Sequence, residues 1–268
     1  MKNFQYILLA LLLFSGVNML KAQGKWYASS SFQMVGSSFN DGESHNSYFL
    51  YGGMRYYSPA FSISMSVPVV FGSENAYSQI GEMYLPNDGG YENGGRMSNG
   101  SGMNGASGIG LGDLYLNGSF RIIKELETIP DISIEGYIKF PTATPNIGIG
   151  TGEFDSQIGI GLKKFIGRVS LFGQFGYLFI GDNGQAANTN PFTISAGIGY
   201  AFGMGTHSIL LAYDSYTTIV QGVASPRQLA LGYNYMINYG LFFTAIVSAG
   251  LNSSASDYTI SGGLNFEL

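Results

Sequence analysis

The sequence predicts an all-β protein, a 12-stranded antiparallel up-and-down transmembrane β-barrel of the outer membrane. Composition is the first reason: only 11% of the 268 residues are charged, against about 25% in soluble domains. The chain also contains 40 glycines, 19 tyrosines and 19 phenylalanines. After the N-terminus, no apolar run reaches the roughly 20 residues that a spanning helix needs. These features argue against a soluble enzyme and against a bundle of membrane helices.

The second reason is a repeat of alternating segments, each about 10–13 residues long and separated by turn-forming residues. There are twelve, an even number, as in bacterial outer-membrane barrels whose ends lie on one side. The predicted strands are 25–36, 47–57, 60–71, 109–122, 131–141, 154–165, 168–180, 191–203, 206–217, 226–236, 239–250 and 256–268.

Residues 1–22 precede the first strand and are typical of a secretory signal peptide. Lys2 supplies the positive charge, residues 7–14 form the apolar segment, and Leu20-Lys21-Ala22 precedes a cleavage point. We therefore expect the barrel to comprise residues 23–268. The chain has no Cys, which excludes disulfides and thiol chemistry, and its net charge of −5 offers nothing to a nucleic acid.

Alternation within the strands is the third reason, because it assigns each residue to a face. In 60–71, apolar Phe61, Ile63 and Met65 oppose Ser62 and Ser64. The same phasing predicts eight charged residues in the lumen: Arg55, Asp113, Arg121, Glu135, Lys139, Asp155, Asp214 and Glu267. Two interpretations stay open: the charges pair and fill the interior, or they line a polar pathway.

The connections alternate between short and long, which orients the barrel. The short ones are Ser58-Pro59, 123–130, Ile166-Gly167, 203–205 and Ile237-Asn238. Short turns face the periplasm in outer-membrane barrels, so both chain ends are expected there. Aromatic residues near strand ends would form interfacial girdles; they are Trp26, Tyr27, Tyr56, Tyr57, Tyr200, Phe202, Tyr235 and Tyr239.

The loop 72–108 is the longest connection. Its simplest interpretation is an external loop; the alternative is that it folds inward as a constriction or lid. Its acids Glu82, Asp88 and Glu92 do not match the ligand spacing of a calcium loop. We predict no metal site and no cofactor.

Pro68 lies inside the third predicted strand, where a closed barrel has no free edge. A bulge or kink is therefore expected beside it. The simpler interpretation is a harmless bulge near the rim, and the functional one is a lateral opening into the bilayer. The final strand ends Gly263 to Leu268 with apolar residues at alternate positions, and it resembles the signal read by the barrel-assembly machinery.

From Ile109 onward the chain resembles the outer-membrane family called "putative MetA-pathway of phenol degradation", a relative of the long-chain fatty-acid transporter barrels. The resemblance covers about residues 109–235, and where the family often has Pro-Thr-Gly this chain has Pro-Thr-Ala. Its motifs are Gly110-Leu111-Gly112-Asp113-Leu114, Lys139-Phe140-Pro141-Thr142, Gly148-Ile149-Gly150-Thr151-Gly152, Asp155, Gly176-Tyr177 and Gly181-Asp182. It implies a channel or transporter for small, hydrophobic or aromatic compounds.

A hydrolase site would need Ser, a His base and a group that orients the His. The only histidines are His45, near Ser47 but at a loop end, and His207, adjacent to Ser208 and hence on the opposite face. We therefore predict no enzyme. The predicted function is passive or facilitated passage of small molecules through the outer membrane of a Gram-negative bacterium, with membrane lipid as the surroundings and the solute unidentified. The alternative is a non-transporting structural or adhesive barrel that acts through its external loops.

Overall fold

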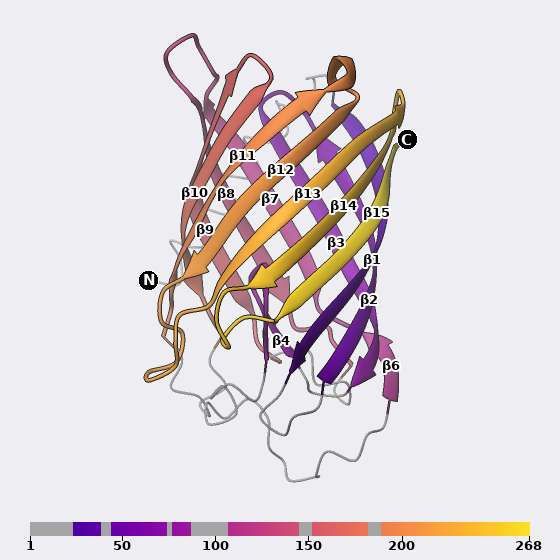
Figure 1. Cartoon of the computed structure of the whole chain (residues 1–268), viewed down its shortest axis with the longest axis vertical. Coiled ribbons are helices and arrows are strands. Elements are labelled where there is room, and N and C mark those ends of the chain that lie inside the picture. Colours follow the sequence, from indigo (N-terminus) through magenta and orange to yellow (C-terminus); the bar gives the residue numbers. More distant parts are fainter. Residues whose placement is uncertain (1–23, 39–43, 74–76, 87–106, 145–151, 182–188) are drawn as a thin grey trace, which may run out of the picture.

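The computed structural model describes residues 24–38, 44–73, 77–86, 107–144, 152–181 and 189–268. Figure 1 shows a barrel of tilted strands. Its strands are β1 (Lys25–Ser38), β2 (Ser44–Tyr57), β3 (Phe61–Ser73), β6 (Ser107–Leu111), β7 (Leu114–Ile123), β8 (Asp131–Phe140), β9 (Asp155–Ile166), β10 (Val169–Phe179), β11 (Phe192–Phe202), β12 (His207–Tyr216), β13 (Arg227–Asn238), β14 (Leu241–Gly250) and β15 (Tyr258–Glu267). A separate hairpin consists of β4 (Tyr77–Ile80) and β5 (Met83–Pro86).

Every neighbouring pair in the sheet is antiparallel, and the first and last strands close it. β1 pairs with β15 over ten residue pairs, from Tyr27 opposite Glu267 to Gly36 opposite Tyr258. β6 and β7 lie one after the other along β3, so together they occupy one strand position. The prediction of a closed 12-stranded barrel is confirmed.

The two ends of the barrel differ in their connections. At one end, which we call the turn end, the strands are joined by short turns, and at the other, the loop end, by longer segments. The turn predicted at Ile237-Asn238 lies two residues later. β13 continues to Asn238 with a register shift after Met236, and the turn falls at Tyr239-Gly240.

Side chains alternate between the two faces of the wall. On β9, Ile158, Ile160 and Leu162 are exposed on the outside, while Asp155 and Gly159 are buried on the lumen side. This outer apolar face needs a non-aqueous surrounding, because such a large exposed apolar surface is unusual in a soluble protein. Among the described residues, no helix has the length and hydropathy to cross a membrane.

The break between β6 and β7 lies beside Pro68. The Gly112 N–H donates to the Pro68 carbonyl at 2.8 Å. In an antiparallel strand the N–H and C=O of one residue point the same way, so the missing N–H of Pro68 faces this break. The segment after β8 covers it, because Leu111 and Leu114 donate their N–H groups to the hydroxyls of Thr144 and Thr142.

Candidate functional site

The β4–β5 hairpin lies inside the loop-end half of the barrel. One set of its residues packs on the β1–β3 wall, where Tyr77 and Tyr84 contact Val35, Phe49 and Val70. The other set packs on the remaining wall in a cluster of Ile80, Met83, Leu85, Tyr115, Tyr137, Leu178, Ile180, Tyr216, Ile219 and Val220. Residues 77–86 therefore fold into the barrel, and the interpretation of this part as an external loop is wrong. The rest of the loop, 74–76 and 87–106, lies outside the described residues.

Hydrogen bonds tie both strands of the hairpin to their surroundings. Near the barrel rim, the Tyr77 hydroxyl donates to the His45 carbonyl at 2.6 Å, and the Ser256 N–H donates to the Tyr84 carbonyl at 3.0 Å. The hydroxyl of Tyr84 also bonds that of Tyr51 on the wall. The hairpin is thus tied to β2 and to the segment between β14 and β15.

The hairpin tip consists of Gly81 and Glu82 and points toward the turn end. Gly81 has a φ of +63°, a conformation that glycine adopts readily. A Cβ at this position would lie 2.4 Å from the Tyr216 hydroxyl oxygen. The same oxygen accepts the Glu82 N–H at 2.9 Å. Glycine is therefore required at position 81, where the hairpin tip contacts Tyr216 of β12.

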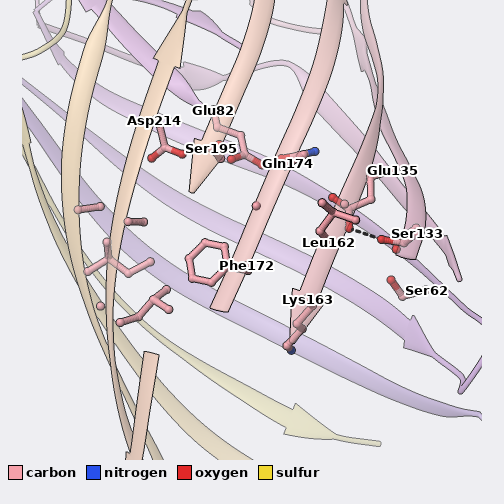
Figure 2. Close-up of a pocket in the computed structure, with 18 of the residues that line it drawn as sticks. Ser62, Glu82, Ser133, Glu135, Leu162, Lys163, Phe172, Gln174, Ser195 and Asp214 are labelled. Atoms are coloured by element: carbon pink, nitrogen blue, oxygen red, sulfur yellow. Dashed lines mark hydrogen bonds between the residues drawn. The ribbon is translucent and has the colours of Figure 1, made fainter. Parts of the chain in front are cut away.

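Beneath the tip lies a cavity of about 580 Å³, which extends from Glu82 and Tyr84 to the β2–β3 turn at Tyr57–Phe61. Much of its wall is uncharged and polar, including Ser62, Ser119, Ser133, Gln174, Ser195 and Gln228. Figure 2 shows Glu82 beside Gln174, Ser195 and Asp214, with Lys163 set apart from them. The hairpin therefore fills the loop-end half of the lumen, and the turn-end half is hollow, with polar and apolar groups in its lining.

Three carboxylates face the cavity near the hairpin tip. Asp214 accepts from Ser195 Oγ at 2.6 Å and from Gln228 Nε2 at 3.3 Å, and Glu135 accepts from Ser133 Oγ at 2.8 Å. The third, Glu82, stands exposed in the lumen, enclosed by the barrel wall. This enclosure, together with the charges of Asp214 and Glu135, raises the pKa of the Glu82 carboxyl.

Cationic side chains line the same spaces. Arg121 Nε lies 2.5 Å from Asp131 Oδ2, and Lys163 lines the same cavity. Arg55 lines a second hollow of about 310 Å³, which Glu82 and Glu135 also line. Four of the eight residues expected in the lumen, Arg55, Arg121, Glu135 and Asp214, thus line these two hollows.

Three further residues of that set come together in a buried cluster in the wall. Lys139 Nζ lies 2.5 Å from Asp155 Oδ2 and 3.8 Å from Asp113 Oδ2, and all three side chains are at most 3% exposed. Backbone groups complete the cluster, because Ala143 N–H donates to Asp113 and Gly181 N–H donates to Asp155. These charges hold the wall together at the β6–β7 break rather than lining the cavity.

Glu267, the eighth residue, lies apart from the others at the turn end. Its carboxylate pairs with Lys25 Nζ at 2.8 Å across the seam between β1 and β15, and the Lys25 side chain is 58% exposed. Glu82 and the hairpin were not among the predicted lumen residues. The signal that could have found them is the apolar character of residues 77, 80 and 83–85, which a water-exposed loop does not need.

The two histidines take part in local contacts. His207 stacks on Phe202 and Tyr235, and its Nδ1 lies 2.8 Å from the Tyr233 hydroxyl. Within the part of the chain that the structure describes, no group of three or more His, Asp or Glu side chains is arranged to hold a metal ion.

The fold has counterparts among solved outer-membrane proteins. The COG4313 outer membrane channel from Pseudomonas putida F1 is 11% identical with a TM-score of 0.61, over 91% of this chain and 96% of that chain. The NanC porin is 10% identical with a TM-score of 0.54, over 91% of this chain and 100% of that one. The KdgM porin, solved in complex with disordered oligogalacturonate, is 9% identical with a TM-score of 0.53, over 90% and 99% of the two chains. The architecture is therefore that of outer-membrane channels and porins.

Sequence comparison gives the family. No curated protein matches the chain. The family model described as "Putative MetA-pathway of phenol degradation" matches residues 77–268, a longer stretch than the motifs quoted above cover. Because this match spans well over half of the 268 residues, the resemblance is confirmed, and the chain belongs to the "Putative MetA-pathway of phenol degradation" family of proteins.

Proposed function

We propose that the protein is an outer-membrane channel through which small molecules diffuse, and that it is not an enzyme. The observation that carries the proposal is the cavity of about 580 Å³, lined in part by serine, glutamine and charged side chains, inside a closed barrel whose outer face is apolar. A channel needs a wetted interior and a lipid-compatible exterior, and both are present. The turn end then faces the periplasm and the loop end faces the outside.

The hairpin is the constriction of this channel. Its buried residues Tyr77, Met83 and Leu85 are at most 1% exposed, so they leave little space between the hairpin and the wall. Solute passage then requires movement of the hairpin or a path along its edge. The test is to insert the purified full-length protein into planar lipid bilayers and to record current. Discrete conductance steps support the channel, and their absence together with no solute flux into liposomes contradicts it.

A structural or adhesive barrel remains the alternative function. It would act through its external loops, whose residues 87–106 lie outside the described residues. The cavity of about 580 Å³ favours the channel, because a pathway for solutes needs open space in the lumen and adhesion through the loops does not. Binding of cells to a surface that persists in a barrel without flux would favour adhesion.

We also propose that Pro68 produces a local bulge, with lateral exit into the bilayer as the competing role. The hydrogen bonds from Gly112 to Pro68 and from β6 and β7 to Thr142 and Thr144 support the bulge, since they bridge the wall at this point. The variant Pro68→Val restores an N–H without removing apolar surface. Unchanged uptake of a hydrophobic probe by cells that carry this variant contradicts lateral exit.

For the route to the membrane, we propose export through a signal peptide of residues 1–22, which lie outside the described residues. Mass spectrometry of the mature protein should find Gln23 as its first residue. We further propose that the final strand, β15, is recognised by the barrel-assembly machinery. Truncating its last residues should lower the amount of protein in the outer membrane.

A further inference from the structure

We propose that Glu82, at the tip of the hairpin, sets the charge selectivity of the channel and favours small solutes that carry a cationic amine. This inference rests on the proposed channel function and adds a solute class to it. It follows from the position of Glu82, from the unneutralised charge around it, and from a buried hydroxyl beside it.

The first observation is the position of Glu82 in the lumen. Glu82 lines both the large cavity and the smaller hollow of about 310 Å³, together with Glu135 and Gln174. A solute that moves between these spaces therefore passes the Glu82 carboxylate. The side chain is exposed although it lies inside the barrel, which means that it projects into the open lumen instead of packing on the wall.

The charge at this point is only partly balanced. Within the described part of the chain, the Glu82 carboxylate makes no ion pair, and Glu135 and Asp214 are bonded by the neutral groups of serine and glutamine side chains. Arg55 is the cationic residue of the smaller hollow, and Arg121 is already paired with Asp131. Among the described residues, the three carboxylates thus share these spaces with two cations outside that pair, Arg55 and Lys163, so the charge around Glu82 is net negative.

The Tyr137 hydroxyl provides an independent observation. The residue is 7% exposed and lines the smaller hollow beside Glu82 and Glu135. Apart from an approach to the backbone of Gly81, this hydroxyl has no hydrogen-bond partner among the described residues. An ammonium group has three donors and no acceptor, so it matches the carboxylate oxygens of this site, and the buried Tyr137 oxygen becomes a further acceptor only when the hairpin tip moves.

A fixed charge inside the barrel acts strongly on passing ions. Charges interact several-fold more strongly near protein than in bulk water, because the effective dielectric constant is lower. Rings of acidic side chains are a common basis of cation selectivity in pores. A carboxylate that lines both hollows is therefore expected to influence passing ions more than acidic residues that line neither.

The test uses the full-length protein in bilayers of neutral lipid with a potassium chloride gradient. The wild type should show a reversal potential of cation-selective sign. Glu82→Gln should lower the ratio of cation to anion permeability by about twofold or more, and Glu82→Lys should lower it further. Glu127→Gln is the matched control, because it removes the same charge from an exposed residue of the β7–β8 turn.

A second measurement addresses the solute class. Liposomes that contain the wild type should admit ethanolamine faster than glycerol or acetate, and Glu82→Gln should remove this preference. A conducting wild type whose reversal potential and solute preference are unchanged by Glu82→Gln overturns the assignment of Glu82 but leaves the channel intact. A wild type without conductance overturns the channel function and this assignment with it.

Discussion

The two halves of the lumen are formed by the same strands and differ in the residues that point inward. In the loop-end half many of these residues are apolar or aromatic, such as Val35, Phe49 and Tyr115, and the β4–β5 hairpin covers them. In the turn-end half they are small and polar, such as Ser119 and Ser133, and a cavity remains. The inward face of a barrel is therefore not uniformly polar, and an apolar stretch on it indicates that another segment fills the lumen there.

The most direct way to break this contrast is to remove the hairpin. Deletion of residues 77–86 should open the loop-end half and raise single-channel conductance several-fold, because the pathway then lacks its constriction. Planar-bilayer recording measures this effect. Equal conductance before and after deletion would mean that solutes do not pass the hairpin.

Charge pairing offers a second contrast between the two halves. Lys139→Met leaves Asp113 and Asp155 buried without a cation, which should lower the free energy of unfolding by about 3–5 kcal/mol. Lys25→Met breaks the exposed pair with Glu267 at the turn end and should change stability little, because water and salt screen that pair. Urea unfolding in detergent micelles, followed by tryptophan fluorescence, compares the two variants.

A smaller effect is expected at the β6–β7 break. A Cβ on Gly112 would lie 2.6 Å from Cγ of Pro68. Gly112→Ala should therefore destabilise the barrel by about 1–3 kcal/mol, as overpacking does. Pro68→Ala in the same chain removes the ring that the methyl group meets. The double variant should be more stable than Gly112→Ala alone; if it is not, steric conflict with Pro68 is not the cause.

The smallest effect concerns the turn end and its pH dependence. The Glu125 carboxylate accepts the Phe165 N–H at 2.8 Å and lies 3.1 Å from Lys164 Nζ, and these contacts lower the pKa of Glu125. A lowered pKa in the folded state gives a stabilisation that is complete above the usual value near 4.5 and is lost as the pH falls through the folded value. The unfolding midpoint of Glu125→Gln should therefore fall less on acidification than that of the wild type. Parallel curves for the two proteins would contradict this role.

Sequence periodicity predicts the strands of the barrel wall well, but it does not predict which segment fills the lumen. All twelve predicted strands overlap observed ones, because lipid outside and lumen inside impose alternation on each strand. Periodicity does not predict the break at Gly112-Asp113, because the break depends on contacts with Pro68 and Thr142, which are distant in sequence. Periodicity does not predict the hairpin either, because strands of four residues are too short for a periodic signal.

Among the eight charged residues named from the sequence, phasing could not separate those that line the cavity from those buried in pairs. Asp113, Lys139 and Asp155 lie on three different segments, and only their register brings them together. Asp214 and Glu135 share the same inward direction but face open space. Alternation gives the direction of a side chain, whereas its partner depends on the stagger between strands.

The seam between β1 and β15 has a consequence for assembly. Its partners Tyr27 and Glu267 are separated by almost the whole chain, so this seam is among the contacts of highest sequence separation in the molecule. Contacts of this kind form slowly because a long loop must be closed first. Until β15 is in place, β1 and β14 are open edges whose backbone groups can pair with other chains. Closure of the barrel is therefore expected to be a late, all-or-none event that requires the C-terminal strand and ends the exposure to aggregation.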